Sequence, residues 1–333
     1  MTARNLDSID RRDFLKGAAA GLVLLPHTDF GSLGLGPSTR TSTVAVIRTT
    51  DRMDGVARAM ALLDPTGMAG KSVVIKPNFN TADAAPAGTA NETLMQLVRE
   101  LQERDAKAIT LGESSGPPNT GEVMAEKGIP DMASDMDFSV VNFDEIPDAD
   151  WVHFQPSGTH WPEGFHLPRQ VVNAEYNVST CCLKTHGFGG VFTMSMKLSV
   201  GLTPKPIRRS LHRSPDMRRM IAELNQGFTP QLIVMDGVDT FVDGGPTRGT
   251  PKPGNVVVAG TDRVAVDAVG LAILKNLGSN DAIMGTPIFE QEQMARAVEV
   301  GLGVTGPEQI ELVSDNDEGT SYTSTLKGIL AEG

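Results

Sequence analysis

The stretch Ser72-Val73-Val74-Ile75-Lys76-Pro77-Asn78 decides the fold class, because a short β-branched run ends abruptly in polar residues. Such a run is typical of a strand that is buried on both faces of a parallel sheet. Similar runs recur along the chain, and segments with the apolar spacing of a helix, such as Asn91–Arg104, lie between them. This alternation predicts an α/β fold with a mostly parallel sheet and helices on both faces.

The other elements follow from the same two patterns. Further strands are expected at Thr43–Arg48, Ala108–Leu111, Phe138–Phe143, Val178–Leu183, Leu232–Met235, Val256–Ala259 and Ile310–Val313. Further helices are expected at Met53–Leu63, Gly121–Lys127, Val191–Val200, Ser214–Asn225, Asp262–Leu277 and Phe289–Val300. We expect a single α/β domain over residues 43–315 and a C-terminal tail over residues 316–333. An irregular or antiparallel insertion is expected at about residues 145–175, which carry both tryptophans and three of the six histidines.

The amino-terminal residues have the order of a twin-arginine export signal. Arg11 and Arg12 are followed by Phe14-Leu15-Lys16 and a short apolar run that ends in proline. We therefore expect residues 1–26 to be a signal peptide and residues 27–42 to be a flexible linker; the alternative is an ordinary amphipathic helix. The protein is expected to be periplasmic or otherwise exported, with the twin-arginine translocase as a partner. It would meet the membrane only if the signal stays uncleaved.

Composition limits the classes of partner and cofactor. The 333-residue chain has a formal net charge of −12, which argues against nucleic acid as a partner. Its two cysteines, Cys181 and Cys182, are adjacent, and no Cys-x-x-Cys motif is present. No cysteine-ligated iron–sulfur cluster is therefore expected in this chain.

Polar clusters follow four of the expected strands. They are Lys76-Pro77-Asn78, Gly112–Gly116, Lys184–Gly187 and Asp236–Asp239. In open α/β sheets, ligands bind just beyond the carboxyl ends of the strands. The four clusters are therefore expected to form one polar site, although each of them has an ordinary alternative as a strand end, a cap or a turn.

Several residues of these clusters receive expected roles. The candidates for binding a phosphate or carboxylate are Lys76, Asn78, Ser114, Ser115, Thr193 and Lys197. The candidates for catalysis are Glu113, Lys184, His186 and Asp236. Asp236 and Asp239 are also the candidates for holding a divalent metal ion. If residues 191–200 are helical, Thr193 and Lys197 lie on one face at i and i+4.

A basic run follows this dense stretch. It contains Arg208, Arg209, His212, Arg213, Arg218 and Arg219. Most of these residues are expected on a solvated face, with contact to an anionic ligand or another protein as the alternative.

Five short motifs together resemble a known family. They are Ile75–Asn78, Leu183–His186, Thr193–Gly201, Gly244-Gly245-Pro246 with Gly249, and Ala259–Asp267. In this order they resemble the bacterial and archaeal family called domain of unknown function 362, over about residues 43–315. The resemblance implies a shared fold and shared site positions, but no reaction. Some members carry ferredoxin-like cysteine motifs, which this chain lacks, and Leu198 stands where asparagine typically follows the second lysine.

These observations favour an exported enzyme that binds a small anionic substrate, with its reaction unassigned. No Gly-x-Ser-x-Gly elbow or Walker loop is present, so an ordinary serine hydrolase or P-loop enzyme is not expected. One alternative is a periplasmic protein that binds a ligand or cofactor without turnover. Another is an accessory subunit of an exported redox complex, docking through the insertion.

Overall fold

The structure, a computed structural model, describes residues 41–332. The expected signal peptide and residues 27–40 of the expected linker lie outside the described residues. Strand β1 (Ser42–Arg48) begins where that linker was expected to end, and Ser42 is already buried.

One large mixed sheet organises the described chain, in the order β12-β1-β11-β9-β7-β2-β3-β4. Its other strands are β2 (Ser72–Lys76), β3 (Ala108–Glu113), β4 (Ser139–Asn142), β7 (Tyr176–His186), β9 (Leu232–Gly244), β11 (Val256–Gly260) and β12 (Ile310–Val313). The five neighbours from β9 to β4 run parallel, with Ile75 of β2 opposite both Leu111 and Val178. Strand β11 runs antiparallel to β1 and β9. Two short strands, β8 (Val191–Thr193) and β10 (Gly249–Pro253), extend β7 and β9 as hairpins.

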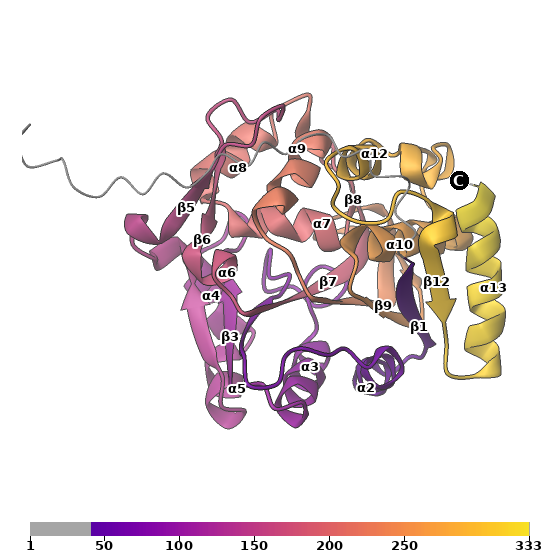
Figure 1. Ribbon diagram of the computed structural model, residues 1–333, viewed down its shortest axis with the longest axis horizontal. Helices are drawn as coiled ribbons and strands as arrows, with labels where there is room; N and C mark the ends of the chain where they lie inside the picture. Colours follow the sequence, from indigo (N-terminus) through magenta and orange to yellow (C-terminus); the bar gives the residue numbers. More distant parts are fainter. Residues whose placement is uncertain (1–40, 333) are drawn as a thin grey trace, which may run out of the picture. The chain divides into compact units, whose positions relative to one another are not determined.

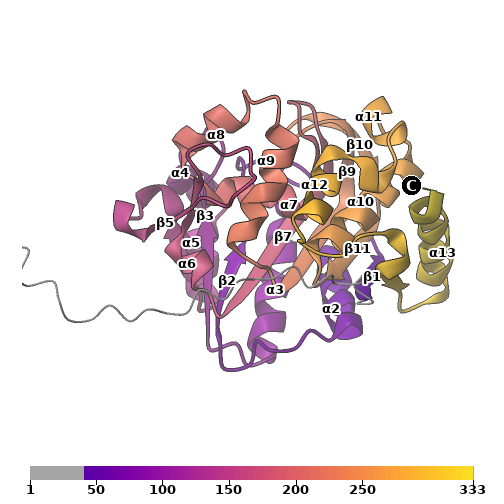
Figure 2. The same ribbon diagram turned by 45° about the horizontal axis from the view of Figure 1, so that its top comes forward.

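Helices cover both faces of the sheet (Figures 1 and 2). One face packs against α2 (Arg52–Leu63), α3 (Asn91–Glu103), α4 (Thr120–Glu126) and α5 (Ile129–Asp135). The other packs against α7 (Ser195–Leu198), α9 (Met217–Leu224), α10 (Arg263–Leu277) and α12 (Glu292–Glu299). Shorter helices are α6 (Arg169–Val172), α8 (Lys205–Leu211) and α11 (Asp281–Met284), with 3₁₀ turns between elements. The predicted α/β fold is confirmed, and no described helix is long and apolar enough to cross a membrane.

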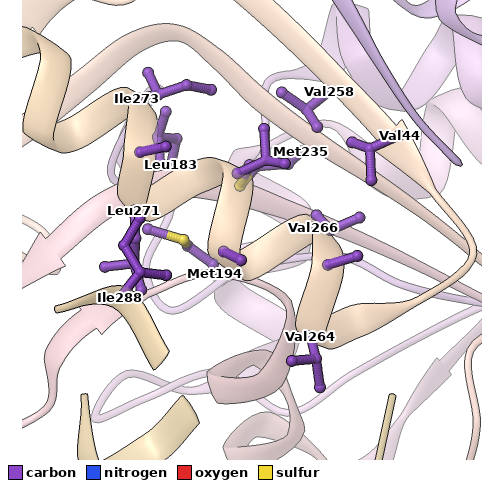
Figure 3. Close-up of a cluster of buried hydrophobic side chains, with 14 of the residues drawn as sticks. Val44, Leu183, Met194, Met235, Val258, Val264, Val266, Leu271, Ile273 and Ile288 are labelled. Carbon is purple, nitrogen blue, oxygen red and sulfur yellow. The ribbon is translucent and has the colours of Figure 1, made fainter. Parts of the chain in front are cut away.

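Helix α10 is the central helix of one face. Its residues from Arg263 to Leu274 are all buried, and Asp262 caps its first turn by accepting hydrogen bonds from the backbone of Val264 and Ala265. Figure 3 shows its apolar side chains beside those of β1, β7, β9 and β11. Met194, which directly precedes α7, lies in the same cluster. The core of the sheet therefore reaches the segment that carries Lys197.

The insertion contains a separate antiparallel pair, β5 (Trp151–Phe154) and β6 (Phe165–Pro168), as expected. Its apolar side chains join a third core cluster with α9. Trp161 is 5% exposed and donates its indole N–H to the Met220 carbonyl at 3.0 Å. Trp161 therefore anchors the insertion to the fold.

Two local predictions were wrong. Residues 191–200 do not form one helix: they form β8, the four-residue helix α7 and the start of a 3₁₀ turn. Antiparallel pairing with β7 places Thr193 opposite Lys184, and this tertiary contact overrides the local helical spacing. The described part of the expected C-terminal tail is packed on the fold, because Asp317–Glu332 is helix α13, whose Leu326 and Leu330 are buried in the core.

Candidate functional site

A cavity of about 840 Å³ opens at the carboxyl ends of β2, β3 and β7. Seven of the expected site residues line it: Lys76, Asn78, Glu113, Ser114, His186, Thr193 and Lys197. Parallel strands bring their carboxyl ends to one edge, and this shared position joins residues that are far apart in the chain. The wall opposite the strands comes from α7, α8 and the residues around them.

Lys76 and Glu113 form a buried ion pair on the cavity wall. The Lys76 Nζ lies 2.5 Å from Glu113 Oε1, and the two side chains are 6% and 1% exposed. Glu113 also accepts backbone N–H groups from Phe79 at 2.8 Å and from Ser114 at 2.7 Å. Burial lowers the pKa of Lys76, and the neighbouring carboxylate opposes that shift. Because its oxygens already have three donors, Glu113 is better suited to holding Lys76 than to exchanging protons.

Lys197 faces the same cavity without such a partner. It is 8% exposed, and its ammonium makes no hydrogen bond or ion pair within residues 41–332. Burial lowers its pKa to about 7, and the charges of Lys184 and Arg208 add to that effect. The hydroxyl of Thr193, on the neighbouring strand, is also buried without a hydrogen-bond partner. Buried polar groups normally have hydrogen-bond partners, so the lack of a partner at both Lys197 and Thr193 sets this cavity apart from the paired groups around it.

His186 lies beside Lys197 at the end of β7. Its Nδ1 accepts the backbone N–H of Gly190 at 3.2 Å, so the neutral ring carries its proton on Nε2. Burial lowers the pKa of His186 to about 2, and Lys197 contributes to the shift, so the ring is neutral at physiological pH. A Cβ at Gly190 would lie 2.8 Å from His186 Nδ1 and 2.9 Å from Lys197 Cε. Only glycine leaves room here for both side chains.

The turn after His186 holds strained backbone. Val191 has a φ of 61°, a region that β-branched residues rarely adopt, and Gly189 has a φ of 83°. Phe188 in the same turn is 71% exposed at the mouth of the cavity. Strained backbone concentrates at functional sites, and this turn adjoins the unpartnered Lys197.

The cavity is strongly basic although the protein is acidic. Six cationic side chains and one carboxylate line it: Lys76, Lys197, Lys205, Arg208, Arg209 and Arg213, with Glu113. Lys205 is paired with Asp144 at 2.8 Å, and Arg208 donates to the carbonyls of Ser114 and Ser115. Arg209 and Arg213 have no carboxylate partner in the described part of the chain. The basic run seen in the sequence thus contributes directly to the cavity, and Lys205 and Phe188 are lining residues that the sequence analysis missed.

Two predicted residues lie behind the cavity wall. Lys184 is fully buried and donates to the Ala87 carbonyl at 2.5 Å, under the loop that follows β2. Burial lowers its pKa. Ser115 is also fully buried, and its carbonyl accepts a hydrogen bond from Arg208 at 2.6 Å. Neither side chain lines the cavity.

Asp236 and Asp239 also lie outside the cavity lining. Asp236 faces α2 and α3, where its Oδ2 accepts from Arg52 Nε at 2.8 Å and from the Thr93 hydroxyl at 3.0 Å. Asp239 accepts from Arg52 Nη2 at 2.6 Å. Arg52 therefore already pairs with both aspartates, and neither of their side chains lines the cavity. The described residues contain no group of three or more His, Cys, Asp or Glu side chains that could hold a metal ion.

Helix α10 holds the start of α7, the short helix that carries Lys197. Asp267 is fully buried, and its carboxylate accepts the backbone N–H groups of Ser195 at 2.8 Å and Met196 at 3.0 Å. These two hydrogen bonds hold the start of α7 on the core. Burial raises the pKa of Asp267 to about 7, and the two backbone donors oppose the shift.

The fold and the cavity define an α/β protein with a basic cavity at the carboxyl edge of its sheet. Residues 73–272 match the family described as a domain of unknown function, DUF362. The chain belongs to this family, as the ordered motifs of its sequence indicated.

Two further comparisons were found. The chain is similar to the thylakoid-associated protein sll1697 of Synechocystis, with 24% identity over 233 aligned residues. The aligned region covers 66% of this chain and 70% of that protein. The lactate racemase apoprotein from Thermoanaerobacterium thermosaccharolyticum is similar with a TM-score of 0.43 and 13% identity, over 88% of each chain.

Proposed function

We propose that this protein binds a small phosphate- or carboxylate-bearing compound in the cavity and acts on it as an exported enzyme. The observation that carries the proposal is the unpartnered ammonium of Lys197, inside a cavity whose lining is basic in a protein of net charge −12. A buried cation without a counter-ion costs free energy, and an anionic ligand would offset that cost. Export rests on the twin-arginine sequence alone.

The chemistry of the site favours Lys197 and His186, and not Glu113, as the residues that contact the ligand. Neutral His186 is suited to donating a hydrogen bond from Nε2, and Lys197 to holding the anionic group or reacting with it. The saturated contacts of Glu113 also support a second candidate function, a binding protein without turnover, because they remove the expected acid–base residue.

Binding is tested by thermal unfolding with phosphate or oxalate, compared with chloride at equal ionic strength. An anion at about one hundred times its Kd adds about 2.7 kcal/mol to the free energy of unfolding. We expect this stabilisation in the wild type and in Lys107→Met, which alters an exposed lysine remote from the cavity, but not in Lys197→Met. Equal stabilisation in all three proteins would refute binding at this site.

Turnover separates the two candidate functions. Pooled small carboxylates and phosphomonoesters are incubated with the protein and analysed by mass spectrometry. Conversion that disappears in Lys197→Met identifies an enzyme. Binding without conversion across the pool favours the binding protein.

A further inference from the structure

The three buried lysines near the carboxyl edge differ in their partners. Lys76 is paired with Glu113 and also donates to the Pro77 carbonyl at 2.6 Å. Lys184 donates to the Ala87 carbonyl and is sealed from the cavity. Lys197 alone among the three both faces the cavity and lacks a hydrogen-bond acceptor within the described chain. Its nitrogen is therefore the one that a ligand can reach without breaking an existing interaction.

We propose that Lys197 is a nucleophilic amine that forms an imine with a small 2-oxo acid bound in the cavity. This inference rests on the proposed function, because it names the class of its anionic ligand. The carboxylate of such a ligand meets the unpaired guanidinium groups that line the same cavity, Arg209 and Arg213. Its carbonyl group is the electrophile that a neutral lysine attacks.

The surroundings of Lys197 keep its amine reactive. The charges of Arg208 and of the fully buried Lys184 both disfavour the charged form of Lys197, and the neutral ring of His186 lies beside it. Desolvation beside cationic groups is one way in which proteins prepare a lysine for imine formation. The lowered pKa of Lys197 agrees with this geometry, since a large share of the amine is unprotonated at neutral pH.

The step balances without a further reactant. The amine nitrogen forms a bond to the carbonyl carbon, and the π electron pair moves to the carbonyl oxygen, which takes a proton from solvent. The resulting hydroxyl leaves as water after a second protonation, and the nitrogen releases its two hydrogens as protons. One amine and one carbonyl thus give one imine and one water, with no change in oxidation state.

Thr193 and Lys197 both line the cavity, and neither the hydroxyl nor the amine has a hydrogen-bond partner among the described residues. The backbone of Gly190 packs against the end of the lysine side chain, because a Cβ at Gly190 would lie 2.9 Å from Lys197 Cε.

The test is reductive trapping of the full-length protein. Glyoxylate or pyruvate is added with cyanoborohydride, and the product is analysed by intact mass and peptide mapping. We expect one adduct on Lys197, formed at least about tenfold faster than on exposed lysines such as Lys107 and slowed by oxalate. Glyoxylate is small and strongly electrophilic, so failure of both compounds to label Lys197 preferentially overturns the inference.

Lys197→Arg separates charge from nucleophilicity. Arginine keeps the cation but does not form the imine, so this variant should retain the stabilisation by oxalate and lose the adduct. An adduct that persists in Lys197→Arg at another residue overturns the inference. If the variant does not fold, the peptide map of the wild type still decides. If oxalate stabilises the wild type but no adduct forms, the inference is overturned and the proposed function stands. If the wild type shows neither stabilisation nor an adduct, both the inference and the proposed function are refuted.

Discussion

At the scale of single residues, lysine takes two different states in one cavity. Lys76 and Lys197 are both buried, but only Lys76 has a carboxylate partner. The ion pair holds the charge of Lys76, whereas burial of Lys197 without a partner disfavours its charged form. Lys197 therefore costs stability in the unliganded protein, which is common for residues that serve a ligand site.

This cost predicts a pH-dependent stability. The pKa of Lys197 is lowered from 10.5 to about 7, so between these pH values the unfolded chain binds more protons than the folded one. The contribution of Lys197 to the free energy of unfolding therefore rises with pH across that window. Lys197→Met should be about 5 kcal/mol more stable than the wild type below pH 7, and this gap should close as the pH approaches 10.5.

Urea unfolding of both proteins at several pH values on either side of 7 measures this difference. Lys107→Met serves as the control, because an exposed lysine should give no gap. A constant difference between Lys197→Met and the wild type across the window would contradict the prediction.

At the scale of elements, α10 connects the core to the site. Its apolar side chains pack on the sheet, and Asp267 binds two backbone N–H groups at the start of α7. The close contact between Gly270 and Met194 adds to this connection, since a Cβ at Gly270 would lie 2.4 Å from the Met194 sulfur. The orientation of Lys197 therefore depends on a helix that does not line the cavity.

Two aspartates on this helix give a matched pair of variants. Asp267→Ala leaves two buried N–H groups unsatisfied and should lower the free energy of unfolding by about 3 kcal/mol. Asp262→Ala removes the cap of the same helix and should cost about 2 kcal/mol, but it leaves α7 untouched. Only Asp267→Ala should weaken anion binding, by about tenfold or more.

Calorimetric titration with oxalate and denaturant unfolding measure the two effects separately. Equal loss of binding in both variants would show that binding follows overall stability, and that Asp267 has no positioning role.

At the scale of the whole molecule, the charge of the cavity is opposite to the net charge of the protein. The protein is acidic overall, whereas six lysine and arginine side chains and one carboxylate line the cavity described above. Such a contrast concentrates small anions at the site and keeps the remaining surface soluble. The expected compartment depends on residues that lie outside the described structure.

Export is tested with the complete chain in a bacterial host. Arg11→Lys with Arg12→Lys should leave most of the protein in the cytoplasm, as should a host without the twin-arginine translocase. Arg4→Lys, outside the arginine pair, should be exported like the wild type. Fractionation and immunoblotting measure the distribution, and an unchanged periplasmic fraction in the double variant would refute the export signal.

The sequence alone determined the α/β class, most of the strands, and the edge of the sheet at which Lys76, Glu113, His186 and Lys197 gather. Hydrophobic periodicity is a local property, and the carboxyl ends of parallel strands share one edge in any strand order. Only the tertiary structure decided which charges meet. Asp236 pairs with Arg52, which is 184 positions away, and Lys184 is sealed behind the wall. Such contacts depend on strand order and on packing between segments that are far apart in the chain, and local spacing determines neither.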